Sequence, residues 1–133
     1  MNVRTYLDSG VLMAAFSAND AAGLRALQIL DDMDRVFVVS DAVRLEVMPK
    51  AIYEKQQDEI DFYEVIFAQA EHLKWHTDTL YHAHDMAETH GIAAMDAIHI
   101  AIALDAGVDE FVTTEKSTKP MFRVTELRMQ SIR

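Results

Sequence analysis

The sequence contains no cysteine, so no disulfide bond can hold the fold together, and the chain suits a reducing compartment such as the cytoplasm. Proline and glycine are also scarce, with two and four residues among 133, and no linker-like segment separates two domains. No apolar run approaches the roughly 20 residues that span a membrane, and the start, MNVRTYLDSG, lacks the apolar segment of a secretory signal. We therefore expect a single cytoplasmic domain, residues 1–133, with no membrane association.

Basic residues are few and unevenly distributed. Residues 1–115 hold seven Lys and Arg against 21 Asp and Glu, whereas residues 116–133 hold five against one. An acidic chain does not bind nucleic acid by bulk charge, because neutralising phosphates requires Lys and Arg. The acids either cover a solvated surface or gather at a site that metal ions neutralise. The basic tail either increases solubility, contacts an acidic partner, or grips phosphates.

Short β-rich segments alternate with helical patterns. The expected strands are residues 3–7, 36–39, 111–114 and 123–127, and the run VFVV at 36–39 is typical of a strand buried on both faces. The expected helices are residues 11–16, 20–34, 41–48, 77–90 and 96–106, with a further helical stretch within 51–70. Strands alternating with helices predict an α/β domain with a central, mostly parallel sheet.

Particular residue types mark the expected helix ends. Asp20, Ser40 and Thr77 are predicted N-caps. Pro49 is expected to end or kink its helix, and a glycine stops each of the last two, at positions 91 and 107.

Four acidic residues fall where a parallel sheet forms its sites, beyond the carboxyl ends of the strands. Asp8 ends the first strand, Glu46 lies in the helix after the second, Asp96 begins a buried helix, and Glu115 follows FVTT directly. We expect these side chains to meet at one edge of the sheet.

Each acid also has an ordinary structural explanation. Asp8 and Asp96 are suited to cap helices. Glu46 has Lys50 four residues further along the chain, and Glu115 precedes Lys116.

A cluster of carboxylates has well-defined chemistry. Like charges within a few ångströms raise each other's pKa and oppose folding unless they are neutralised. Mg²⁺ and Mn²⁺ prefer oxygen ligands, and such ions activate water and orient phosphodiesters.

Four segments of the chain, YLDSGVLMAAF, VVSDAVRLEV, GIAAMDAIHIAIALDAG and EFVTTEK, resemble the PIN-domain family, including the VapC-type ribonuclease toxins, in their order and spacing. The resemblance implies a three-layer α/β/α sandwich with a central, mostly parallel sheet. It implies an Mg²⁺- or Mn²⁺-dependent endoribonuclease that hydrolyses single-stranded RNA and leaves a 5′-phosphate. It also implies a homodimer and, as partner, an antitoxin protein.

The resemblance assigns roles to individual residues. Asp8, Glu46 and Asp96 are expected to be the principal metal ligands, and Glu115 is expected to bind a second metal or to act through water. Thr113 is expected to place a water or a phosphate, and Ser9 to orient the turn at Asp8.

Two residues depart from the family pattern. Gly10 stands where such domains usually carry Asn, and Glu115 stands where they usually carry Asp. A missing Asn side chain would loosen the support of the metal site. The alternative hypothesis is therefore a non-catalytic PIN-like module that binds RNA or a protein partner.

Other motifs compete with this interpretation. His84 and Glu88 share a helix face and could form a zinc pair, or they could belong to a solvated surface. His99 lies one turn after Asp96 and either touches the site or is a core residue. A phosphoacceptor receiver domain needs paired acids after its first strand, and an Asp-x-Asp phosphatase needs Asp at position 10, so neither fits.

Overall fold

A computed structural model describes residues 2–133. This part of the chain forms six α-helices, a short 3-10 helix and a sheet of five strands. In chain order they are β1 (Val3–Leu7), α1 (Ser9–Ser17), α2 (Ala21–Leu30), β2 (Arg35–Ser40), α3 (Asp41–Tyr53), α4 (Gln57–Gln69), β3 (Glu71–Leu73), α5 (Thr77–His90), α6 (Ala94–Ala106), β4 (Glu110–Thr113), η1 (Pro120–Arg123) and β5 (Arg128–Ser131).

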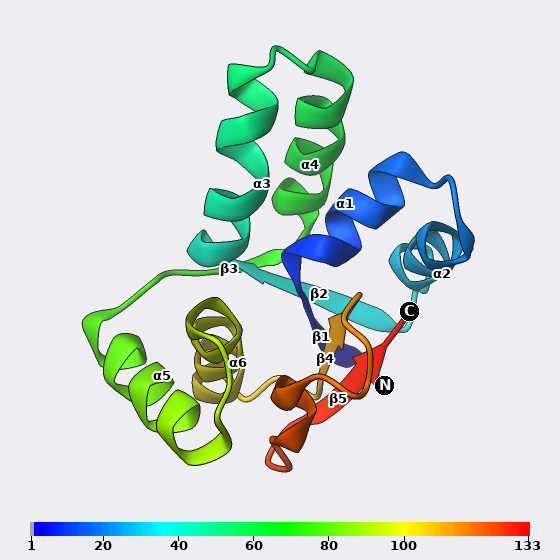
Figure 1. Ribbon diagram of the computed structural model, residues 1–133. Helices are drawn as coiled ribbons and strands as arrows, with labels where there is room; N and C mark the ends of the chain where they lie inside the picture. The colour runs from blue at the N-terminus through cyan, green and yellow to red at the C-terminus, as the bar shows by residue number, and fades with distance from the viewer. Residues whose placement is uncertain (1) are drawn as a thin grey trace.

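The sheet has the strand order β3-β2-β1-β4-β5, and every pairing within the described residues is parallel. The crossovers from β1 to β2 and on to β3 place α1 to α4 on one face, while the return to β4 places α5 and α6 on the other (Figure 1). This three-layer α/β/α sandwich with a parallel sheet is the predicted fold. Strands are therefore added to β1 in two opposite directions: first β2 and β3 on one side, then β4 and β5 on the other.

The central strands owe their position to their apolar residues. Tyr6 and Leu7 of β1, Val38 and Val39 of β2, and Phe111 and Val112 of β4 have no solvent-exposed surface. Such continuous apolar strands are stable only when helices cover both faces of the sheet. Tyr63 and Phe67 of α4 are buried in the core, whereas Tyr53 at the end of α3 is 86% exposed.

Several predicted helix ends are confirmed. The Asp20 carboxylate accepts the Gly23 N–H at 2.8 Å, and the Ser40 hydroxyl accepts the Val43 N–H at 3.3 Å. Gly91 and Gly107 end α5 and α6 with φ of 66° and 65°, in the left-handed region that favours glycine. Thr77 is instead the first residue of α5, because His76 occupies the N-cap position.

Two strand predictions were wrong. Residues 123–127 are not a strand, although Val124 and Leu127 are buried; the last strand is β5, four polar or flexible residues that pair with β4. The three-residue strand β3 was missed because a short, largely exposed edge strand has no apolar pattern. The apolar residues of segment 123–127 therefore indicated burial correctly, but they did not indicate a strand.

The helical stretch around residues 41–70 was also divided wrongly. Helix α3 continues through Pro49 to Tyr53, and α4 begins only at Gln57. Proline removes the N–H that would bind the Leu45 carbonyl, but both residues are exposed, so water can satisfy that carbonyl.

No helix of residues 2–133 combines the length and the apolar character that spanning a bilayer requires.

Candidate functional site

The predicted acids lie around the carboxyl ends of β1 and β4. These strands are neighbours, with Leu7 paired to Val112, and the Asp8 N–H donates to the Val112 carbonyl at 3.0 Å. The helices that follow β1 and the helix that precedes β4 lie on opposite faces of the sheet, and the strand order reverses at this point, which is where open α/β sheets place their sites. This topology brings together residues more than 100 positions apart in the sequence.

Asp8 is held rigidly at the end of β1. The residue is 8% exposed, and its side chain accepts the Ser9 N–H at 2.8 Å as the N-cap of α1. The Thr113 hydroxyl donates to its other oxygen at 2.9 Å. Burial raises the pKa of Asp8, and the neighbouring His99 and the Thr113 hydrogen bond oppose this shift only in part. The capping role and a position in the site are therefore compatible.

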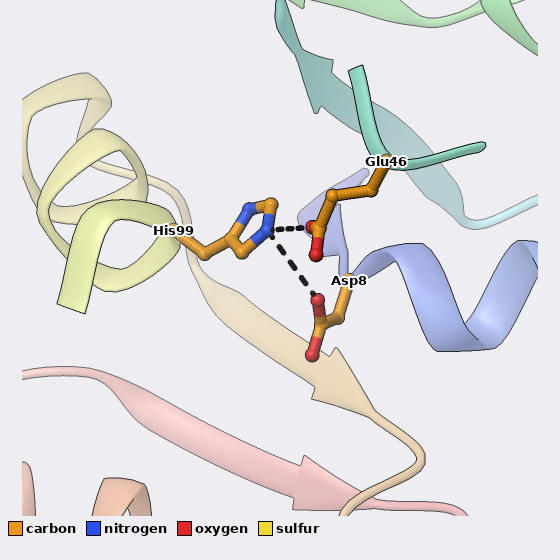
Figure 2. Close-up of side chains that lie close together, drawn as sticks. All are labelled: Asp8, Glu46 and His99. Carbon is orange, nitrogen blue, oxygen red and sulfur yellow. Dashed lines mark hydrogen bonds and ion pairs between the residues drawn. The ribbon is translucent and has the colours of Figure 1, made fainter. Parts of the chain in front are cut away.

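Glu46 reaches the same point from the second turn of α3. The sequence offered Lys50 as its partner, but its carboxylate instead accepts a hydrogen bond from the Nε2 of His99, as Figure 2 shows. This hydrogen bond lowers the pKa of Glu46. The lowered pKa favours the ionised form of Glu46, so the Glu46 carboxylate places a negative charge beside Asp8.

For His99, the sequence left open whether it touches the site or is a core residue, and it was not counted among the site residues. It is 1% exposed, and its Nε2 lies 3.8 Å from Asp8 Oδ1 as well as against Glu46 (Figure 2). Burial by itself would lower the pKa of His99, but the hydrogen bond to Glu46 and the charges of the surrounding carboxylates raise it. The available signal was its spacing, one helical turn after Asp96 on a helix that is apolar almost all round.

Asp96 is the third residue of α6 and does not cap it, because Ala93 occupies the N-cap position. Burial raises the pKa of Asp96, and the charges of Asp8, Glu115 and Glu46 raise it further. The other three predicted acids therefore act on the Asp96 carboxylate, as expected of a shared site.

Glu115 and Thr113 are linked through the end of β4. The Glu115 N–H donates to the Thr113 hydroxyl at 3.1 Å, and that hydroxyl donates to Asp8. The Glu115 carboxylate faces Lys119 at 4.0 Å.

Ligand atoms close enough to share one ion come from a subset of these residues. In the described chain, Asp8, Glu46 and His99 offer atoms within 4.8 Å of one another, and Asp96 and Glu115 lie outside this group. The oxygen-rich, negatively charged surroundings suit a hard divalent cation.

A second cluster that could hold a metal lies on the surface of α5. His84 and Glu88, the pair that the sequence suggested, are joined there by Asp85, and all three side chains are exposed. Exposed groups of this kind are common on solvated helices.

Gly10 lies directly against Thr114. A Cβ at position 10 would be 2.3 Å from the Thr114 hydroxyl oxygen, so that hydroxyl fills the space which a side chain at position 10 would need. Gly10 departs from the family pattern, and the Thr114 side chain occupies the space that the usual Asn side chain would begin to fill.

The fold is an α/β/α sandwich with a parallel sheet, and acids from four segments lie at the carboxyl edge of that sheet. These features define a class of α/β domains suited to holding divalent cations. The family model of the PIN domain matches residues 5–119, and the chain belongs to this family. A comparison with curated proteins finds no match.

Solved structures of the same fold include toxin–antitoxin proteins. VapBC2 from Rickettsia felis, bound to a DNA fragment from their promoter, matches with a TM-score of 0.73 at 14% identity, covering 97% of this chain and 98% of that chain. VapC20 from Mycobacterium tuberculosis, a sarcin-ricin loop cleaving toxin, matches with a TM-score of 0.71 at 15% identity over 93% and 98%. VapBC-1 from nontypeable Haemophilus influenzae matches with a TM-score of 0.70 at 18% identity over 98% of each chain.

Proposed function

We propose that this protein is a metal-dependent endoribonuclease that hydrolyses phosphodiester bonds of single-stranded RNA, and that it is the toxin of a toxin–antitoxin pair acting in the cytoplasm. The observation that carries the proposal is the convergence of Asp8, Glu46, Asp96 and Glu115 on one edge of the sheet. Such a concentration of negative charge is costly in a partly buried site unless a cation neutralises it. Membership of the PIN family and the RNA-cleaving activity of a protein with the same fold agree with this function.

The donor set fits Mg²⁺ or Mn²⁺. Asp8 and Glu46 lie close enough to share one ion, and Asp96 and Glu115, which lie further out at the same edge, would complete the set of four carboxylate ligands. When bound, such an ion would activate water and stabilise charge on the phosphodiester. The chain's own residues prepare the site for this: Thr113 and the Ser9 N–H hold the two oxygens of Asp8 in place, and His99 orients Glu46. Thr113 also accepts the Glu115 N–H, so one hydroxyl links two of the acids.

A protein partner and a homodimer are part of the same proposal. Several large apolar side chains are exposed on α1, α3 and α4, which pack together on one face of the sheet. They include Phe16, Leu45, Ile52, Tyr53 and Val65. Exposed apolar side chains on adjoining helices suit contacts with an antitoxin segment or with a second copy of the chain.

The alternative, a non-catalytic PIN-like binding module, drew its support from Gly10. Because Thr114 fills the space beside Gly10, the missing side chain does not leave the turn unsupported. We therefore place catalysis first.

The first experiment follows thermal unfolding against Mn²⁺ concentration, together with cleavage of a mixed single-stranded RNA. At a hundredfold its Kd, a ligand stabilises the folded protein by about 2.7 kcal/mol. We expect wild type to gain this stabilisation and to cleave RNA. Asp96→Asn should lose the gain and reduce cleavage by about 100-fold or more.

Asp105→Asn is the matched control, since it makes the same change near the other end of the same helix. The metal-induced rise is the quantity to compare. The raised pKa of Asp96 means that its charge opposes folding at neutral pH, so Asp96→Asn should itself stabilise the metal-free protein slightly. RNA binding without cleavage at saturating Mn²⁺ would instead support the binding module.

A further inference from the structure

His99 lies between two carboxylates with the geometry of a ligand. It belongs to α6, whereas Asp8 ends β1 and Glu46 lies on α3, and Figure 2 shows its Nε2 directed at both acids. Two atoms bound to one small divalent ion are separated by about 3 to 4.2 Å, given bond lengths near 2.1 Å. The 3.8 Å between His99 Nε2 and Asp8 Oδ1 falls within that range. The hydrogen bond from Nε2 to Glu46 is closer than this, so the Glu46 carboxylate must draw back from the ring to admit an ion.

The other ring nitrogen of His99 is held as it is in histidines that bind metals. Its Nδ1 lies 2.7 Å from the Tyr6 hydroxyl, and that hydroxyl lies 2.7 Å from the Ser40 hydroxyl. All three side chains are buried. A metal-binding imidazole almost always donates its second N–H to such a partner, which fixes the ring and the tautomer.

The same position of the His99 ring serves the protein with and without an ion. Without an ion, the Nε2–H of His99 donates to Glu46. If Nδ1 carries the proton instead, it donates to Tyr6, the Tyr6 hydroxyl donates to Ser40, and Nε2 presents a lone pair to the space between the acids. The ring need not move, because its buried partners accept either direction of donation.

We propose that His99 Nε2 is a direct ligand, with Asp8 and Glu46, of the divalent cation at this site, and that the site therefore prefers a first-row transition ion to Mg²⁺. This inference rests on the metal site of the proposed function and adds a nitrogen donor to its all-oxygen ligand set. Mg²⁺ takes oxygen ligands almost exclusively, whereas imidazole raises the affinity for transition ions.

Electron spin-echo envelope modulation of bound Mn²⁺ tests the ligand directly. Untagged protein with less than one equivalent of Mn²⁺ should show coupling to a coordinated imidazole ¹⁴N, and the signal should change when the histidines are labelled with ¹⁵N. The coupling should disappear in His99→Gln and persist in His84→Gln. His84 is the matched control because it belongs to the other histidine–carboxylate cluster.

Affinity provides a second readout that a merely structural role would not reproduce. In His99→Gln, the Kd for Mn²⁺ should rise by about 10- to 100-fold, while the Kd for Mg²⁺ should change about threefold or less, because Mg²⁺ gains little from imidazole. Equal losses for the two ions would overturn the inference.

The outcomes separate this inference from the proposed function. Mn²⁺ bound to wild type without imidazole coupling would show that His99 is not a ligand, while leaving the metal site in place. No binding of Mn²⁺ to wild type at all would contradict both. If His99→Gln fails to fold, the ¹⁵N-labelled wild type and His84→Gln decide the question together, because the two clusters of residues 2–133 that could hold the ion contain these two histidines.

Discussion

Gly10, in the first turn of α1, faces Thr114 just beyond the end of β4. Any other residue at position 10 would bring its Cβ to 2.3 Å from the Thr114 Oγ1, while the Thr114 Cβ and Cγ2 would be 3.4 and 3.6 Å away. The conflict is therefore confined to one hydroxyl oxygen. Threonine is branched at Cβ and has few rotamers through which it can yield. The two positions are coupled by packing, although 104 residues separate them.

We expect Gly10→Ala to destabilise the metal-free protein by about 1 to 3 kcal/mol, the usual cost of overpacking. Thr114→Ala alone should cost less than about 1 kcal/mol. The double variant should recover most of the loss, because the clashing oxygen is gone. Urea unfolding of all four proteins measures this coupling, and purely additive losses would contradict the contact.

At the scale of elements, the end of α6 depends on one backbone conformation. Gly107 has φ of 65°, and a Cβ there would meet no atom within 4 Å. Its role is therefore conformational, since it turns the chain from α6 toward β4 without filling space. The N-terminal half of α6 carries Asp96 and His99, so the helix stop and the site can be altered separately.

Gly107→Ala should cost about 1 to 2 kcal/mol of stability, the price of a left-handed alanine. Gly107→Asn should cost less, because asparagine adopts this conformation more readily. Guanidinium unfolding measures both variants. Their affinity for Mn²⁺ should match that of wild type, and a weakened affinity would show that the helix stop also positions the site.

Elements without an apolar pattern were the ones that the sequence did not reveal. Strands β3 and β5 lie at the two edges of the sheet, and they exist because β2 and β4 offer unpaired backbone groups. Val124 and Leu127 are buried without belonging to any strand. Apolar residues therefore indicate burial, whereas backbone pairing is decided by whatever strand lies alongside.

At the scale of the whole molecule, the charge is divided between an acidic body and a basic end. The net charge of −10 repels RNA, yet Lys116 and Arg133 line a hollow of about 760 Å³ together with Phe122 and Gln130. This hollow begins one residue after Glu115, so positive charge adjoins the acids. If the chain cleaves RNA as proposed, phosphates next to the cleaved one would meet these basic side chains.

If this end contacts RNA, binding should depend on salt through its lysines. The Asp96→Asn variant allows binding to be measured without cleavage, and we expect log K to fall linearly with log salt concentration. Changing both Lys116 and Lys119 to Gln should reduce the slope by about 1.4, or about 0.7 for each phosphate contact to a single strand. Changing Lys50 and Lys55, on and just after α3, is the charge-matched control and should leave the slope unchanged.

The sequence by itself determined what local pattern can encode. The alternation of strands and helices, the three buried strands, the glycine helix stops and the position of an acid at the end of β1 all follow from side chains near in sequence. These features predicted the α/β fold class and a parallel sheet, and both are confirmed. The assignment of individual acids to metal binding stays a prediction for the experiments above.

Only the tertiary structure decided which side chains meet. The strand order places β1 beside β4, so the Thr113 hydroxyl reaches Asp8. Helix α6 packs near α3, so Glu46 forms its hydrogen bond with His99 and not with Lys50. Helical and strand periods show which face of an element is buried, but not which residue it is buried against. A buried polar group takes its partner from whatever element the topology brings beside it, because leaving it unpaired costs more than any local preference.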